Sequence, residues 1–285
     1  MKIPSSHLPP ASQQFDVETS HFLVKCHTWG NRDGTPLLLL HGFLGSGEDW
    51  SGIAEHLSAK YRIYALDLPG HGFTRPEERV PDILSHYTME AVAQTVLDCL
   101  DAMDIEQIYL AGYSMGGRLA LYLTLCYPTR FGSAAILSAT AGLKTEEERS
   151  ERVKHDETIA KRLEMEASED FMRFWYEQPL FAPFREHPSF VRVVKQRLFT
   201  ESANAAKALR GMGTGAQPPV WDVLGSNRVP IVFAAGERDA KFVALAQEMH
   251  VATPFSTLAV LANAGHVVHH EATTEVASLL IKQFV

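Results

Sequence analysis

A serine between glycines, placed directly after a short apolar run, is the feature that most restricts how this chain can fold. The run 108–110 is followed by Gly112, Ser114 and Gly116, which fit the pattern Gly-x-Ser-x-Gly. This pattern is typical of a nucleophile elbow, a sharp turn between a strand and a helix that lifts the serine hydroxyl into a cleft. The motif is short, so its weight depends on the sequence around it.

Short apolar runs alternate with helical segments on both sides of this serine. One or two edge strands are expected at 15–29, further strands at 37–40, 61–66, 107–111 and 133–138, and helices at 88–103 and 118–127. Such alternation predicts an α/β fold with a mostly parallel, doubly wound sheet. Ligands of such sheets bind at the carboxyl ends of the strands, which is where Ser114 falls.

The alternation stops after about residue 140 and resumes after residue 221. The residues between are helical in pattern, charged, and rich in arginine and aromatic side chains, which favours a helical cap inserted into the sheet domain. Later strands are expected at 230–235 and 257–261, and a closing helix at 273–284. The predicted division is a loose, proline- and serine-rich lead-in at 1–14, an α/β core at 15–140 and 222–285, and a cap at 141–221.

Composition excludes several classes of protein. The net charge of −8 disfavours a nucleic-acid-binding surface, and it would repel an anionic substrate unless arginines gather locally. No segment resembles a signal peptide or reaches membrane-spanning length, so a cytoplasmic enzyme without membrane contact is expected, as a monomer or small homo-oligomer. Cys26, Cys99 and Cys126 lack a C-x-x-C pattern and are expected to be buried apolar side chains.

Two later residues have the order and position expected of partners for the serine. A serine hydroxyl needs a histidine, and a carboxylate that fixes the histidine tautomer, to act as a nucleophile or base. On this type of sheet the acid and then the histidine follow late strands. Asp239 follows the run 231–235, and His266 follows 257–261. We therefore predict a catalytic triad of Ser114, Asp239 and His266.

Two backbone N–H groups are candidates for an oxyanion hole. One belongs to Met115, which follows the serine at the start of the helix. The second is expected in the loop after an early strand, where Phe43 follows His41 and Gly42. The alternative is that this His-Gly pair is only turn chemistry.

Neither a metal nor an organic cofactor is predicted. His269 and His270 lie near His266, but no set of carboxylates or thiolates accompanies them as metal ligands. The glycines within 42–47 do not fit a dinucleotide-binding fingerprint.

Arginines separate the possible substrates. Arg118 stands four residues beyond the elbow serine, where a guanidinium would be costly to bury without an anion. Arg149 and Arg152 share one helical face of the cap, and Arg197 follows. The cap arginines could instead be surface charges paired with the glutamates at 146–148. Because bidentate guanidinium groups bind carboxylates well, we expect a substrate with more than one carboxylate.

Several motifs carry a resemblance to a known family. General signatures are H-G-F at 41–43, D-L-P-G-H-G at 67–72 and A-G-H at 264–266. More specific motifs are G-Y-S-M-G-G-R at 112–118, E-R-S-E-R at 148–152, W-Y-E-Q-P-L-F at 175–181 and G-E-R-D-A-K-F at 236–242. From about residue 37 onward the chain resembles the α/β-hydrolase superfamily and, within it, the 2-succinyl-6-hydroxy-2,4-cyclohexadiene-1-carboxylate synthases of menaquinone and phylloquinone biosynthesis.

The resemblance implies both residue roles and a reaction. It assigns the family triad to Ser114, Asp239 and His266, and substrate-binding roles to Arg118, Arg152, Arg197, Tyr113 and Trp175. The implied reaction is a lyase step that eliminates pyruvate from a cyclohexene bearing three carboxylates, with no metal or cofactor. The serine would remove a proton alpha to the succinyl ketone, while the N–H groups of Phe43 and Met115 hold the enolate oxygen.

Other functions remain open at this point. The same triad would serve a hydrolase of esters, thioesters or C–C bonds with a carboxylate-bearing substrate. A non-catalytic ligand receptor on the same fold, and an interaction protein that binds through its charged cap, are further alternatives. Arg118 and the cap motifs favour the lyase.

Overall fold

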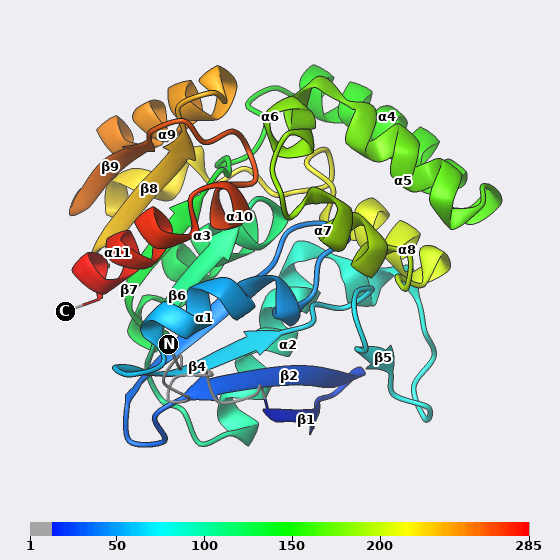
Figure 1. The fold of residues 1–285 in the computed structure, drawn as a ribbon. Coiled ribbons are helices and arrows are strands. Elements are labelled where there is room, and N and C mark those ends of the chain that lie inside the picture. The colour runs from blue at the N-terminus through cyan, green and yellow to red at the C-terminus, as the bar shows by residue number, and fades with distance from the viewer. Residues whose placement is uncertain (1–12, 285) are drawn as a thin grey trace, which may run out of the picture.

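The computed structural model, which describes residues 13–284, is built on one large sheet (Figure 1). Nine strands take the order β1-β2-β4-β3-β6-β7-β8-β9, with β5 paired to β2. From β4 to β9 neighbouring strands are parallel, whereas β2 is antiparallel to β1, β4 and β5. The mostly parallel α/β sheet predicted from the sequence is therefore confirmed. The strands are β1 (Gln13–Glu18), β2 (Phe22–Gly30), β3 (Thr35–Leu40), β4 (Tyr61–Leu66), β5 (Arg75–Pro76), β6 (Ile108–Tyr113), β7 (Phe131–Leu137), β8 (Ile231–Gly236) and β9 (Ser256–Leu261).

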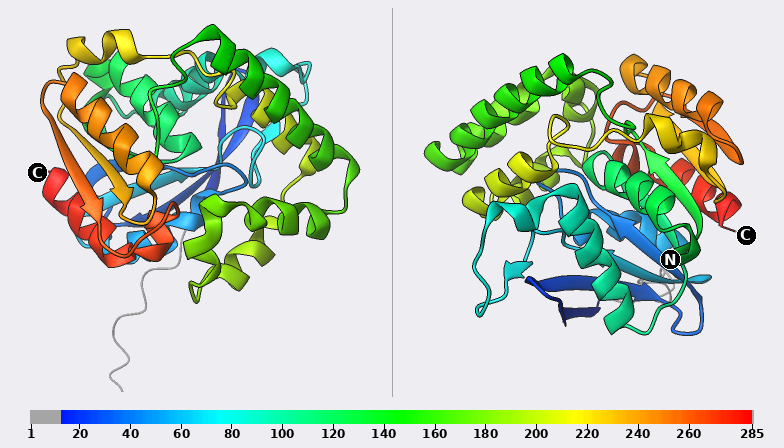
Figure 2. Two further views of the ribbon diagram at one scale, coloured as in Figure 1. Left: turned by 90° about the horizontal axis from the view of Figure 1, so that it is seen from above. Right: turned by 180° about the vertical axis from the view of Figure 1, so that it is seen from behind.

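Helices cover both faces of this sheet, which is why its central strands are continuous apolar runs. On one face α2, α3 and α9 bury their apolar sides, and on the other α1, α10 and α11 do so (Figures 1 and 2). The core helices are α1 (Ser51–Leu57), α2 (Met89–Ala102), α3 (Met115–Cys126), α9 (Ala240–Ala252), α10 (Val268–Glu271) and α11 (Thr273–Gln283). Short 3-10 helices occur at η1 (Gly47–Trp50), η2 (Leu84–Tyr87), η3 (Pro128–Arg130), η4 (Pro179–Phe181) and η5 (Trp221–Ser226).

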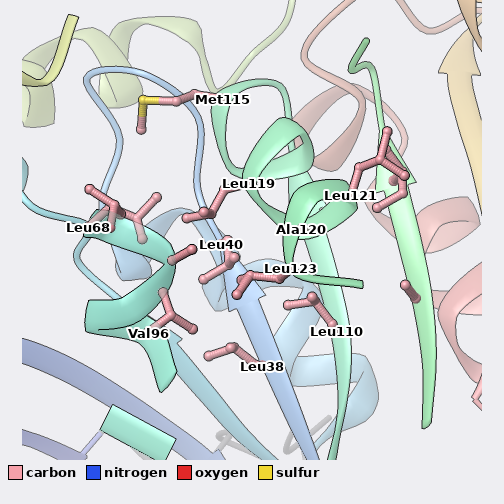
Figure 3. Packing of buried hydrophobic residues seen from close by; sticks show 14 of the residues in the cluster. Leu38, Leu40, Leu68, Val96, Leu110, Met115, Leu119, Ala120, Leu121 and Leu123 are labelled. Atoms are coloured by element: carbon pink, nitrogen blue, oxygen red, sulfur yellow. The ribbon is translucent and has the colours of Figure 1, made fainter. Parts of the chain in front are cut away.

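Strand β3 shows how the sequence selects this layering. Its four leucines at 37–40 are fully buried, and successive side chains point to opposite faces. Leu38 and Leu40 pack with Leu119 and Leu123 of α3 (Figure 3), while the alternate leucines belong to the core on the other face. Each such side chain contributes about 1.5–3 kcal/mol by leaving water, so the strand is held from both sides.

Five helices inserted between β7 and β8 form a cap. They lie together next to the ends at which the parallel strands finish (Figures 1 and 2). These helices are α4 (Glu146–Met165), α5 (Ser168–Glu177), α6 (Ala182–Arg185), α7 (Phe190–Arg197) and α8 (Ser202–Met212). The exact division of the chain at 141 and 221 stays a prediction.

Two local expectations differ from the structure. Strand β1 begins at Gln13, so the last two residues of the expected lead-in belong to the sheet, and residues 1–12 lie outside the described part of the chain. Cys26 and Cys99 are buried as expected, but Cys126 is exposed because it is the last residue of α3. Among the helices of residues 13–284, none is both long and apolar enough to cross a bilayer.

Candidate active site

Ser114 occupies a strained turn between β6 and α3. Its φ of 52° lies in the left-handed region, where a non-glycine residue costs on the order of 1–3 kcal/mol. A Cβ atom at Gly112 would lie 2.2 Å from the Gly116 carbonyl oxygen, and one at Gly116 would lie 2.3 Å from that of Leu40. Only glycine fits at either position, which explains the Gly-x-Ser-x-Gly spacing.

The structure brings the three residues expected to form a triad into one hydrogen-bonded row. Nε2 of His266 lies 3.2 Å from Oγ of Ser114, and its Nδ1 lies 2.7 Å from Oδ2 of Asp239. A carboxylate can only accept, so Nδ1–H donates to Asp239 and leaves Nε2 to accept from the serine hydroxyl. The imidazole and the carboxylate are both buried, which keeps competing water away from them. This is the geometry of an activated serine.

Glu271 of α10 holds the loop that carries His266 through two hydrogen bonds. One carboxylate oxygen accepts from the backbone N–H of Gly265 and the other from that of Val267, each at 2.8 Å. The imidazole also packs against the ring of Phe242, with 4.5 Å between centroids. The histidine is therefore fixed through both of its chain neighbours. Sequence reasoning did not single out Glu271.

Two backbone N–H groups beside the serine are free. The N–H of Gly116 donates to the carbonyl of His41 at 3.0 Å, which fixes the loop after β3 against the elbow. Within the described residues, the N–H groups of Phe43 and Met115 donate to no protein acceptor, and both residues line the cavity in front of Ser114. The first turn of α3 leaves its N–H groups unpaired by construction. Both groups are thus available to an oxyanion.

A cavity of about 840 Å³ lies between the sheet domain and the cap. Ser114 and His266 both line it, and Asp239 stands behind the imidazole. The cavity wall contains every other residue that the sequence singled out as a site residue, namely Phe43, Tyr113, Met115, Arg118, Arg152, Trp175 and Arg197. Strand β6, helix α3, two loops of the core and the cap helices α4, α5 and α7 therefore converge on one space.

Arg118 is a buried cation without a carboxylate partner. Its side chain is 8% exposed, and Nη1 donates to Oε1 of Gln217 at 3.1 Å. Among residues 13–284 it makes no ion pair. Burial lowers the pKa of Arg118 to about 10, with a smaller effect from Arg152 in the same direction and from Asp156 against it, so the group is still charged at neutral pH. A desolvated cation facing a cavity creates a site for an anion.

The other two cavity arginines already have counterions, which the sequence did not predict. Nε of Arg152 lies 2.7 Å from Oδ1 of Asp156, and Nη2 of Arg197 lies 2.6 Å from Oδ2 of Asp49. Burial alone would lower the pKa of Arg197, but Asp49 and the Tyr176 hydroxyl raise it above its usual value. Both guanidinium groups keep further N–H donors, and Nε of Arg197 has no partner in the described residues.

Arg149, the third cap arginine that the sequence singled out, lies elsewhere. Nη2 of Arg149 is 2.6 Å from Oε2 of Glu146, and the residue does not line the main cavity. The surface-charge alternative therefore describes Arg149. His269 lines the cavity beside Tyr113 with 4.2 Å between ring centroids, and the described residues contain no group of three or more side chains placed to bind a metal.

Asp49 lines the cavity and Gln217 accepts a hydrogen bond from Arg118, and no local signal identifies either residue. Asp49 takes part in a capping box with Ser46 at the start of η1, so its local role already accounts for an acid at this position. Gln217 lies in the return from the cap to the core, 99 residues from Arg118. Only the fold places either of them beside an arginine.

Comparisons with known proteins agree with this architecture. The pattern of the family described as alpha/beta hydrolase fold matches residues 35–273. A Yersinia pseudotuberculosis protein named 2-succinyl-6-hydroxy-2,4-cyclohexadiene-1-carboxylate synthase is 33% identical, covering 83% of this chain and 82% of its own length. The solved structure of MenH from S. aureus superposes with a TM-score of 0.82 at 30% identity, covering 93% of this chain and 97% of that chain.

A plant relative is similar over a small part of its length. Protein PHYLLO, chloroplastic, of Arabidopsis thaliana is 30% identical over 94% of this chain, which corresponds to 16% of the plant protein. Together with the fold and the bacterial relatives, these similarities identify the family of this chain. It belongs to the α/β-hydrolase fold family and, within it, to the 2-succinyl-6-hydroxy-2,4-cyclohexadiene-1-carboxylate synthases, which are carbon–oxygen lyases on this fold.

Proposed function

We propose that this protein eliminates pyruvate from 2-succinyl-5-enolpyruvyl-6-hydroxy-3-cyclohexene-1-carboxylate and forms 2-succinyl-6-hydroxy-2,4-cyclohexadiene-1-carboxylate. The observation that carries the proposal is Arg118, a buried cation that pairs with no carboxylate of residues 13–284 and lines the cavity that also holds Ser114 and His266. The substrate has a ring carboxylate, a succinyl carboxylate and an enolpyruvyl carboxylate. A substrate with three carboxylates would supply a negative counterion for the Arg118 guanidinium.

The proposed chemistry begins with proton transfer. His266, oriented by Asp239, takes the proton of the Ser114 hydroxyl, and the serine oxygen removes the ring proton alpha to the succinyl ketone. The ketone oxygen becomes an enolate, stabilised by the N–H groups of Phe43 and Met115. Loss of one such preorganised donor typically costs about 10²–10³-fold in rate.

The elimination then completes without an acyl-enzyme. Electrons return from the enolate through the ring, the double bond moves, and the C–O bond to the enolpyruvyl group breaks. Pyruvate leaves as its enolate and takes up a proton on carbon, and the ring keeps its hydroxyl group as a diene. Arg118, Arg152 and Arg197 bind the carboxylates and hold the breaking bond in position.

The test offers the purified protein the enolpyruvyl cyclohexene and follows release of pyruvate. Ser114→Ala should lower turnover by about 10³-fold or more while the folded protein still binds substrate. Ser278→Ala, an exposed serine of α11, is the matched control and should react like the parent. No pyruvate, together with rapid cleavage of a neutral aryl ester, would assign the triad to a hydrolase instead.

A further inference from the structure

Ser138 is a second serine in this cavity with an unusual conformation. It follows directly after β7, and its φ of 49° lies in the left-handed region. The residue is 1% exposed and lines the cavity, and its hydroxyl has no hydrogen-bond partner within residues 13–284. Its backbone is held in place, because its N–H donates to the Ala234 carbonyl at 2.8 Å.

Two unfavourable features thus coincide at one position. Glycine would adopt this φ without steric cost, whereas a serine is strained there. A buried hydroxyl that makes no hydrogen bond also loses its interaction with water. Neither feature stabilises the sheet, since Ser138 bonds to the neighbouring strand only through its backbone N–H. A strained backbone and an unpartnered buried hydroxyl, both at one residue of the cavity wall, indicate a contact with whatever fills the cavity.

The neighbours of Ser138 indicate what that contact is. The preceding carbonyl, of Leu137, accepts the N–H of Ser114 at 2.9 Å, so Ser138 adjoins the nucleophile elbow. Two residues further on, Nε2 of Gln217 donates to the Thr140 carbonyl at 3.3 Å, and Oε1 of the same amide accepts from Arg118. Ser138 therefore lies between the elbow and the support of the unpaired guanidinium. A hydroxyl donor that lines the same cavity as the Arg118 cation suits an anionic oxygen.

We infer that Ser138 is a further substrate-binding residue, whose hydroxyl donates a hydrogen bond to a carboxylate oxygen of the substrate next to Arg118. This inference rests on the proposed function, because that function supplies the carboxylate. The Ser138 hydroxyl and the Arg118 guanidinium then bind the same carboxylate, and this orients the substrate so that its acidic C–H faces Ser114.

The experiment measures substrate affinity without turnover. In a Ser114→Ala parent, both Ser138→Ala and Ser138→Gly should weaken binding of the enolpyruvyl cyclohexene by about 10- to 100-fold, since each removes a hydrogen bond to a charged group. Titration calorimetry gives these affinities. Ser138→Gly should also keep or raise the melting temperature, because it removes the strain and the unpartnered hydroxyl. A purely structural serine would instead lower the melting temperature and leave affinity unchanged.

A control variant tests whether the effect on affinity is specific to Ser138, and two outcomes separate failure of this inference from failure of the proposed function. Asp104 also has a positive φ, 57°, but it is exposed and outside the cavity, so Asp104→Gly should leave substrate affinity unchanged. If the Ser114→Ala parent binds the enolpyruvyl cyclohexene and both Ser138 variants bind it as tightly as the parent does, the inference is overturned and the proposed function stands. If the folded parent does not bind the substrate, the proposed function fails and the inference fails with it.

Discussion

Asp49 and Arg197 form a buried ion pair in the wall of the cavity, with 2.6 Å between Oδ2 and Nη2. The two residues are 148 positions apart, one before α1 and one at the end of cap helix α7, so the pair joins the core to the cap. Burial alone would raise the pKa of Asp49, but Arg197 lowers it below its usual range. The cap is thus fixed to the core by an electrostatic contact inside the site.

Breaking this pair should destabilise the protein. Asp49→Asn leaves the Arg197 guanidinium buried without its counterion, and removal of one partner from such a pair typically costs about 3–5 kcal/mol. Urea unfolding at pH 7 measures the change. Glu146→Gln removes the partner of Arg149 from an exposed pair and should shift the unfolding midpoint far less. Equal shifts in the two variants would contradict the role of the buried pair.

Arg118 should matter for the substrate and not for the fold. Arg118→Met replaces the guanidinium side chain with a shorter, unbranched apolar one and removes a desolvated charge, so the free energy of unfolding should stay level or rise. The KM for the enolpyruvyl cyclohexene should increase by about 10- to 100-fold, because a charge-assisted hydrogen bond is lost. Arg149→Met, at the cap surface, is the control and should leave KM unchanged. Parent-like kinetics for Arg118→Met would remove Arg118 from the site.

Glu271 should act on the rate through the position of His266. In Glu271→Gln, only the amide oxygen can accept a hydrogen bond, so the carboxamide cannot hold the N–H groups of both Gly265 and Val267. We expect kcat to fall by about 10-fold with little change in KM, since a misplaced base costs rate and not affinity. Steady-state kinetics separate the two. Glu275→Gln, on the exposed side of α11, is the control and should have the kinetics of the parent. A rise in the KM of Glu271→Gln as large as its fall in kcat would argue against this role.

Acid should destabilise the fold through buried histidines. Burial is the main cause that lowers the pKa of His270 to about 4, with Arg197, Arg192 and His187 acting in the same direction and Asp49 against them. Between the unfolded value near 6.5 and pH 4, the unfolded chain binds a proton here that the folded chain does not, so stability falls as pH falls.

A substitution isolates this contribution. His270→Leu should reduce the stability lost between pH 7 and pH 5 by about 2 kcal/mol, because the unfolded state no longer gains that proton. Unfolding curves at both pH values measure it, and replacement of the exposed His56 by leucine is the control. An unchanged pH dependence in His270→Leu would contradict the assignment. His71, whose pKa burial lowers to about 3, leaves some acid sensitivity in the variant.

The sequence by itself determined the sheet and the hydrogen-bonded row of Ser114, His266 and Asp239. Four consecutive leucines at 37–40 are what a strand covered on both faces requires. The glycines around Ser114 are required by contacts that admit no Cβ atom. Asp239 and His266 follow neighbouring parallel strands, β8 and β9, whose carboxyl ends meet at one edge of the sheet. Such features depend on local geometry and on strand order, and both are visible in residue patterns.

Only the tertiary structure decided how the charges are matched. The partners of Arg118 and Arg197 lie 99 and 148 residues away, and no periodicity links positions so far apart. The strain at Ser138 is equally invisible, because a serine after a strand adopts an ordinary φ in most loops. Pairing and strain depend on how the cap meets the core, and that contact exists only when the whole chain has folded.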